Sequence, residues 1–134
     1  MPNFSRTVTV NTDIDSAFGF LSDFRNLEKW AEGDEGELIT KEPLRQGSVF
    51  KVKTHFNNKQ REYNYEIIEW GPPLRVSLQA STSIFTIVDT IFLSANSKGT
   101  EVTYSVDIKY KFPFFVLGIF CLLYTSDAAD EHSW

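Results

Sequence analysis

The sequence predicts an α+β fold in which helices cover one face of a curved antiparallel sheet of about seven strands. From residue 38 to residue 112 the pattern is almost wholly that of strands with alternating apolar and polar side chains, joined by short turns. Residues 14, 17, 18 and 21 are apolar and have the spacing of one helical stripe. An apolar segment that starts at Pro113 has no two-residue period, so we expect a C-terminal helix there.

The N-terminal part predicts one strand followed by two short helices. Phe4 to Val10 alternates as a half-buried strand does, with Arg6 as the one exception on its apolar face. Thr12–Asp15 resembles a capping box, with an acidic residue at the third helical position, and is expected to start the first helix. Ser22–Asp23 is expected to cap a second short helix that runs to about Trp30.

The strands that follow the helices are expected to form a meander. Residues 57–59, 71–73 and 96–99 are rich in Asn, Gly and Pro and mark its turns. From the alternation we expect the first helix to pack near the edge of the sheet. The residues expected on the concave face are Phe50, Val52, Phe56, Val102, Tyr104, Val106 and Ile108.

Length and composition indicate one ordinary globular domain. The chain has 134 residues, of which 42% are hydrophobic and 23% charged, and its formal net charge of −5 argues against a dedicated nucleic-acid binder. One cysteine excludes a disulfide framework and leaves too few thiolates for a zinc site. No run of about 18 apolar residues occurs and the N-terminus lacks the pattern of a signal peptide, so we expect no membrane span and a cytoplasmic location.

Few side chains are candidates for chemistry. His55 shares the strand parity of two lysines, so we expect it on the solvent face rather than as a general base. The acidic residues 32–37 lack the ligand spacing of a calcium loop and are expected to form a solvated loop. Asp89 lies in an otherwise apolar strand: on the inner face burial would raise its pKa and make it an acid or base, whereas on the outer face it would point to water. Tyr104 is the second catalytic candidate.

No cofactor and no metal are expected. The chain has no glycine-rich phosphate loop, no Walker pattern and no dinucleotide fingerprint, which makes nucleotides poor candidates as ligands.

Three stretches carry a resemblance to a known family. They are Val8–Trp30, which contains a D-x-x-N-x-x-x-W segment, Ile68–Arg75 with its Pro-Pro turn, and Gly99–Tyr104, which reads G-T-x-V-T-Y. In this order and spacing they resemble the SRPBCC (START-like) superfamily, closest to its polyketide cyclase/dehydrase-type branch. The resemblance implies a helix-grip fold, with two short helices between strands 1 and 2 and a long C-terminal helix that closes a hydrophobic pocket. Members bind lipids, sterols, polyketides, hormones or quinones, and a minority are enzymes.

Nine side chains are candidates for lining this pocket. The resemblance places Phe24 and Trp30 at the pocket mouth, although both are also explained as plain core. Strand alternation places the others on the inner face, where core packing explains them about as well as a cavity does. The candidates are Phe24, Trp30, Phe50, Val52, Phe56, Phe92, Tyr104, Val106 and Ile108.

The end of the chain departs from the family pattern. Residues 121–131 resemble a translated sequencing adapter, so we expect residues 121–134 to be a non-native tail. The domain is then residues 1–120, with an incomplete C-terminal helix that leaves the pocket open along one side.

These observations favour the binding or transport of a hydrophobic small molecule, such as a lipid or a polyketide, in a cavity between the sheet and the C-terminal helix. A polyketide cyclase/dehydrase-type enzyme is one alternative, in which Tyr104, Asp89 or a water between them moves a proton. A protein-interaction or chaperone-cofactor module is another. The sequence indicates no nucleic-acid partner and does not specify an oligomeric state.

Overall fold

A computed structural model of the chain describes residues 3–56 and 58–111, with only the backbone of Asn3 and Phe56. The predicted C-terminal helix and the predicted non-native tail lie outside the described residues. No helix of the described part is long and apolar enough to cross a membrane. In chain order the elements are β1 (Asn3–Val10), α1 (Ile14–Leu21), the 3-10 turn η1 (Phe24–Asn26), α2 (Leu27–Trp30), β2 (Asp34–Leu38), β3 (Val49–Phe56), β4 (Lys59–Gly71), β5 (Arg75–Ser81), β6 (Phe85–Asn96) and β7 (Gly99–Tyr110).

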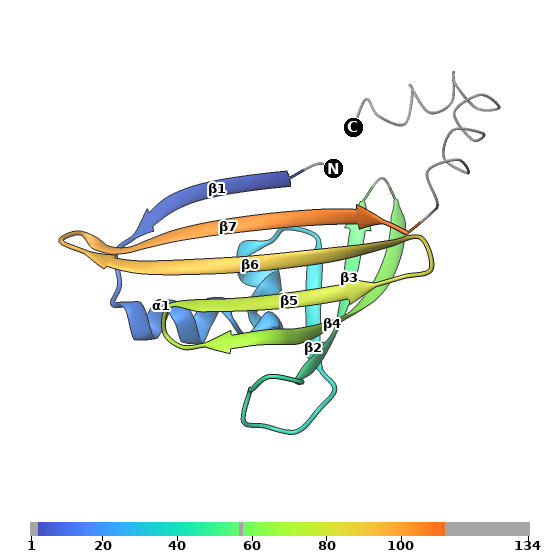
Figure 1. The fold of residues 1–134 in the computed structure, drawn as a ribbon, viewed down its shortest axis with the longest axis horizontal. Coiled ribbons are helices and arrows are strands. Elements are labelled where there is room, and N and C mark those ends of the chain that lie inside the picture. The colour runs from blue at the N-terminus through green and yellow to red at the C-terminus, as the bar shows by residue number, and fades with distance from the viewer. Residues whose placement is uncertain (1–2, 57, 112–134) are drawn as a thin grey trace, which may run out of the picture.

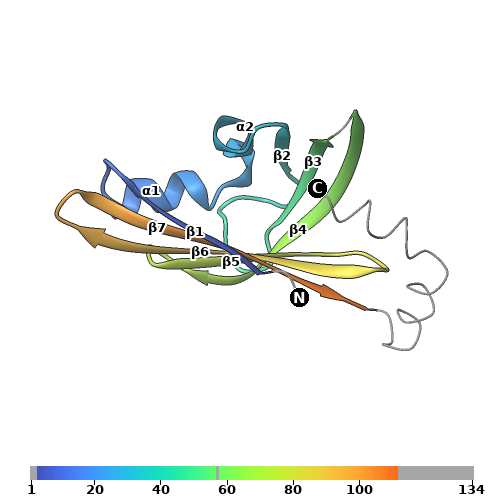
Figure 2. The same cartoon turned by 90° about the horizontal axis from the view of Figure 1, so that it is seen from above.

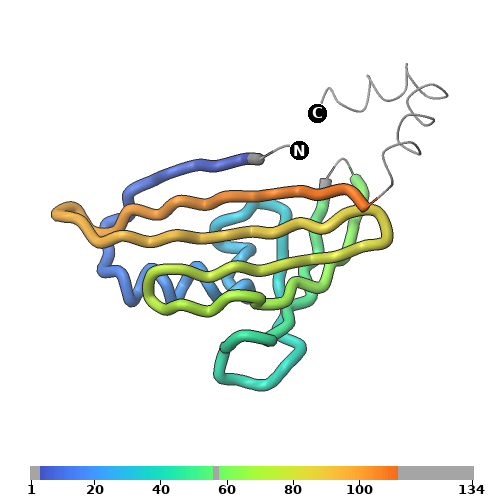
Figure 3. The backbone as a smooth tube through the Cα atoms, viewed as in Figure 1, coloured from blue at the N-terminus to red at the C-terminus, as the bar shows by residue number. Residues whose placement is uncertain are grey.

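The strands form one antiparallel sheet of seven, in the order β1-β7-β6-β5-β4-β3-β2 (Figure 1). Strands β2 to β7 are a meander of neighbours, and β1 joins the sheet beside β7. The sheet curls, and α1 and α2 lie on its concave side (Figure 2). The predicted α+β fold, the predicted strand number and the two short helices between β1 and β2 are confirmed. The loop of residues 39–48 extends away from the sheet on the side opposite β1 (Figure 3).

Both predicted helix starts are present, and the first is displaced by one residue. The cap of α1 is Asp13 rather than Thr12, because the Asp13 carboxylate accepts the Ser16 N–H at 3.0 Å and the Ser16 hydroxyl at 2.7 Å. Asp23 caps η1 by accepting the N–H of Arg25 at 3.0 Å. The chain then passes directly from η1 into α2, so the second predicted helix is a 3-10 turn followed by one α-helical turn.

The prediction of a solvated loop over residues 32–37 is wrong, because residues 34–38 form the edge strand β2. Gly36 explains how this acidic segment reaches the sheet. It pairs with Val52 of β3, and a Cβ added at Gly36 would lie 1.9 Å from the carbonyl oxygen of Phe24. The backbone of η1 therefore packs directly on the backbone of β2, which the acidic composition of the segment does not reveal.

The hydrophobic core lies between the concave face and the helical segments, with Phe24 at its centre. The Phe24 side chain is 1% exposed, and its ring centroid lies 5.6 Å from that of Tyr65, 5.7 Å from Phe50 and 6.3 Å from Trp30. Strand pairing places six of the predicted concave-face residues on the core side of the sheet. They are Phe50, Val52, Val102, Tyr104, Val106 and Ile108; the side chain of Phe56 lies outside the described part.

We expect Gly36→Ala to destabilise the protein by about 1–3 kcal/mol or more, because the new methyl group would collide with a carbonyl that cannot move without displacing η1. Gly19→Ala is the matched control. Gly19 is in α1 with no atom within 4 Å of an added Cβ, so alanine there should stabilise the fold by about 0.5–1 kcal/mol. Urea unfolding of both variants measures the difference. Equal stability of the two variants would contradict the close approach of η1 and β2.

Candidate ligand-binding site

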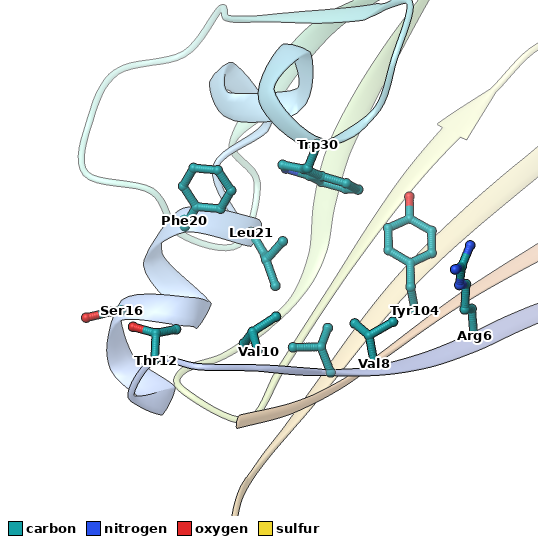
Figure 4. Close-up of a pocket in the computed structure, with 10 residues that line it drawn as sticks. Arg6, Val8, Val10, Thr12, Ser16, Phe20, Leu21, Trp30 and Tyr104 are labelled. Carbon is teal, nitrogen blue, oxygen red and sulfur yellow. The ribbon is translucent and has the colours of Figure 1, made fainter. Parts of the chain in front are cut away.

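A cavity of about 730 Å³ lies between the edge of the sheet and the helical layer. Strands β1 and β7 form one wall, α1 forms another, and the end of α2 contributes Trp30 (Figure 4). The residues that line it are Arg6, Val8, Val10, Thr12, Ser16, Phe20, Leu21, Trp30, Val102 and Tyr104. Most of these side chains are aliphatic or aromatic, as in sites that bind apolar molecules.

The register between β1 and β7 builds the sheet wall. Arg6 pairs with Tyr104, and Val8 pairs with Val102. Because side chains alternate along a strand, Arg6, Val8 and Val10 all project from the face that carries Tyr104. The other wall comes from the helix, where Ala17 and Phe18 are buried in the core while Phe20 and Leu21 point toward the cavity.

Asp89 lies on the inner face of the sheet, beside the aromatic end of the cavity. It pairs with Leu78 and Val106, is 6% exposed, and accepts a short hydrogen bond at Oδ2 from the hydroxyl of Tyr104. The second carboxylate oxygen, Oδ1, has no hydrogen-bond partner among the described residues. The alternative that Asp89 points to water is therefore wrong.

Burial controls the protonation of this pair. Loss of solvation raises the pKa of Asp89 to about 6, although the hydrogen bond from Tyr104 opposes the increase and the charge of Asp34 adds to it. Burial, and then the negative charge of Asp89, raise the pKa of the Tyr104 phenol well above its usual range. Tyr104 therefore keeps its proton, stays neutral and donates a hydrogen bond to Asp89. A carboxyl group that titrates near neutral pH is suited to proton transfer.

Trp30 completes the aromatic end of the cavity. Its ring lies edge-on to Tyr104, with 5.7 Å between the ring centroids, and its Nε1 has no hydrogen-bond partner among the described residues.

Within the part of the chain that the structure describes, the other titratable groups near the helical layer do not form a metal site. Burial raises the pKa of Asp34, and the charge of His55 partly opposes this increase. His55 itself is exposed, and its Nδ1 lies 3.1 Å from the carbonyl oxygen of Gly33. In residues 3–56 and 58–111, no three His, Cys, Asp or Glu side chains gather as a metal site would.

The structure separates the nine predicted pocket residues into several groups. Trp30 and Tyr104 line the cavity. The core residues Phe24, Phe50 and Val52 do not line it, and neither do Val106 and Ile108, which lie farther along β7. Phe56 lies outside the described side chains.

The placement of Phe92 on the inner face is wrong. Phe92 pairs with Thr103, whose neighbours in β7 are the inward residues Val102 and Tyr104, so Phe92 projects from the opposite face. It is 38% exposed, and the guanidinium carbon of Arg75 lies 4.7 Å from its ring centroid.

Sequence reasoning missed the wall made by β1 and α1. Alternation predicts the apolar row of β1 as one face of a strand but does not identify β7 as the neighbouring strand, so it gives no reason to assign Val8 and Val10 to the pocket. The one available signal was Arg6, a charged residue in that apolar row. Among the described residues it is the single charged side chain that lines the cavity.

The family described as polyketide cyclase / dehydrase and lipid transport matches residues 1–121. Several solved structures share the fold at low identity. Protein CV1439 of Chromobacterium violaceum is 15% identical, with a TM-score of 0.66 and coverage of 83% of each chain. Protein DR_A0006 of Deinococcus radiodurans is 10% identical, with a TM-score of 0.66 and coverage of 81% of this chain and 83% of that chain. The di-domain ARO/CYC BexL is 12% identical, with a TM-score of 0.64 and coverage of 81% of this chain and 36% of that chain. No curated protein sequence matches the chain.

We expect Asp89→Asn to gain stability relative to the wild type as the pH rises. The folded state holds the Asp89 proton up to about pH 6, against an ordinary value of 3.8. The neutral Asp89 carboxyl group therefore contributes its full stabilisation at a pH below the pKa that Asp89 has in the unfolded chain. This stabilisation is lost as the pH rises through the pKa that Asp89 has in the folded protein. The shift corresponds to about 3 kcal/mol.

Unfolding of wild type and Asp89→Asn from about pH 4 to about pH 7.5 measures this difference. Asp107→Asn removes one negative charge from the opposite face of the sheet and is the matched control. A constant difference between wild type and Asp89→Asn across this range would show that Asp89 is not buried as described.

Proposed function

The chain belongs to the polyketide cyclase/dehydrase and lipid-transport family, and we propose that it binds and carries an apolar small molecule in the cavity between β1, β7 and α1. The observation that carries the proposal is the exposure of large apolar side chains toward one cavity. Val8 is 44% exposed and Phe20 is 39% exposed, and both line it. Packing of the described core does not require either side chain there.

Size and chemistry of the cavity support the same proposal. A volume of about 730 Å³ is in the range of small-molecule sites. Burial of about 250 Å² of apolar ligand surface would contribute roughly 6 kcal/mol before the costs of association. No catalytic group is needed for this activity. The cytoplasmic location expected from the N-terminal sequence stays a prediction.

We expect Val8→Trp to weaken the binding of the neutral dye N-phenyl-1-naphthylamine about tenfold or more, because the indole would occupy the space along the β1 wall where the dye is proposed to lie. Thr9→Trp is the matched control, since Thr9 is exposed on the opposite face of the same strand. Dye fluorescence titration of both variants and the wild type gives the three affinities. Equal affinities, or no binding to the wild type, would contradict the proposal.

A second candidate function is proton transfer on a ketone-bearing ligand, as in a cyclase/dehydrase-type enzyme. The Asp89–Tyr104 pair favours it, because an ionised carboxylate that is poorly solvated is a stronger base than one in water. Asp89 would remove a proton from the carbon next to the carbonyl, directly or through a water. The resulting enolate would take a proton from solvent at that carbon, and Asp89 would release its own proton to solvent.

We expect such an activity to exchange deuterium into the α-carbon of 1-tetralone in heavy water. The rate, followed by proton NMR, should rise with pH through about pH 6 as Asp89 loses its proton, and Asp89→Asn should reduce it to the buffer rate. Exchange at the buffer rate with the wild type would contradict the proton-transfer activity and leave ligand binding as the proposed function.

A further inference from the structure

Arg6 is a cation in a row of apolar side chains, and neither the binding of an apolar molecule nor the Asp89–Tyr104 pair requires its charge. Its inward neighbours on β1 are Phe4 and Val8, and its partner on β7 is Tyr104. The residue is exposed, and its guanidinium makes no ion pair within the described part of the chain. Figure 4 shows the guanidinium beside the ring of Tyr104 at one end of the cavity, with Val8 and Val10 leading away from it toward α1.

We propose that Arg6 binds the carboxylate of an amphipathic ligand whose apolar part lies along β1 toward Phe20 and Leu21. This inference rests on the proposed binding function and names the ligand class, an apolar acid such as a fatty acid.

Covering the charge of Arg6 with a neutral ligand is costly. A ligand that fills the cavity removes water from the residues that line it, and Arg6 is among them. A cation that loses water without gaining a partner is strongly destabilising. A neutral ligand that covers Arg6 therefore carries a penalty that a ligand with an anionic end avoids.

The donors near Arg6 fit a carboxylate better than other anions. The guanidinium presents parallel N–H groups that match the two oxygens of one carboxylate. The Tyr104 hydroxyl is already donating to Asp89, and the Ser16 hydroxyl is already donating to Asp13. Arg6 is thus the one charged donor that lines the cavity among the described residues; the Nε1–H of Trp30 also has no partner among them, but it is neutral and buried. One guanidinium suits a carboxylate better than a phosphate with three oxygens to satisfy.

The residues around Arg6 favour one orientation of the ligand. Arg6 is on β1 and Asp89 is on β6, with Tyr104 of β7 between these two strands. The Asp89 carboxylate therefore repels an anion placed over β6, on the side of Tyr104 away from Arg6. From Arg6 to Val10 the strand rises about 13 Å, along which the inward side chains are apolar. The acid group is therefore held at Arg6, and the apolar chain extends toward α1.

The test compares 11-(dansylamino)undecanoic acid with its methyl ester, which has the same apolar part and no charge. We expect the wild type to bind the acid about tenfold more tightly than the ester at low salt, and Arg6→Gln to lose this preference. Arg6→Gln should bind the ester at least as tightly as the wild type does, because the neutral side chain removes the penalty of covering a charge. Arg6→Lys keeps the charge without the parallel donors and should retain part of the preference. Added salt should weaken binding of the acid and leave binding of the ester unaffected.

Arg45→Gln is the matched control, because Arg45 is exposed in the loop of residues 39–48, away from the cavity. Melting temperatures of all variants report folding. Equal affinity of the wild type for acid and ester, or an equal loss in Arg45→Gln and Arg6→Gln, would overturn the role of Arg6 while the binding function stands. Failure of both probes to bind would instead overturn the proposed function.

Discussion

The pairing of β1 with β7 is the contact on which the candidate site depends. It joins residues nearly a hundred positions apart, as in the 3.0 Å contact between the Thr7 and Thr103 hydroxyls on the outer face. A slip of one residue would turn Val8 and Val10 to the outer face and remove the apolar wall of the cavity. The tight turn at Gly99 restricts such a slip, because a Cβ there would lie 2.2 Å from the carbonyl oxygen of Val10.

Local signals account for the part of the fold that the sequence predicted. Alternation identified the strands, Asn, Gly and Pro marked the turns, and Asp23 marked the start of the second helical segment. Each of these signals is contained within a few residues. Strand β2 was missed because its formation depends on Gly36 meeting the backbone of Phe24, a contact between segments that neither segment encodes alone.

The site was predicted in part for the same reason. Trp30 and Tyr104 were identified, one from a family motif and one from a clear strand, whereas the β1 wall required knowledge of which strand lies beside β1. Phe92 was assigned to the wrong face because β6 is apolar on both faces where Ile91 and Phe92 adjoin. Period alone does not choose a face in such a strand, and only its pairing with β7 does.

Stability of the fold explains the buried aromatic residues of the core, but it does not explain the charged residues Asp89 and Arg6. Phe24 and Phe50 fill the space between η1 and β3 and explain the fold without any ligand. Asp89 is different: its raised pKa means that the folded state disfavours its charge, and an apolar residue would pack there at lower cost. Asp89 and Arg6 lie on either side of Tyr104, and no ion pair joins them among the described residues. Charges placed in this way beside an apolar wall support the proposed ligand site in the cavity lined by β1, β7 and α1, rather than one in the packed core around Phe24 and Phe50.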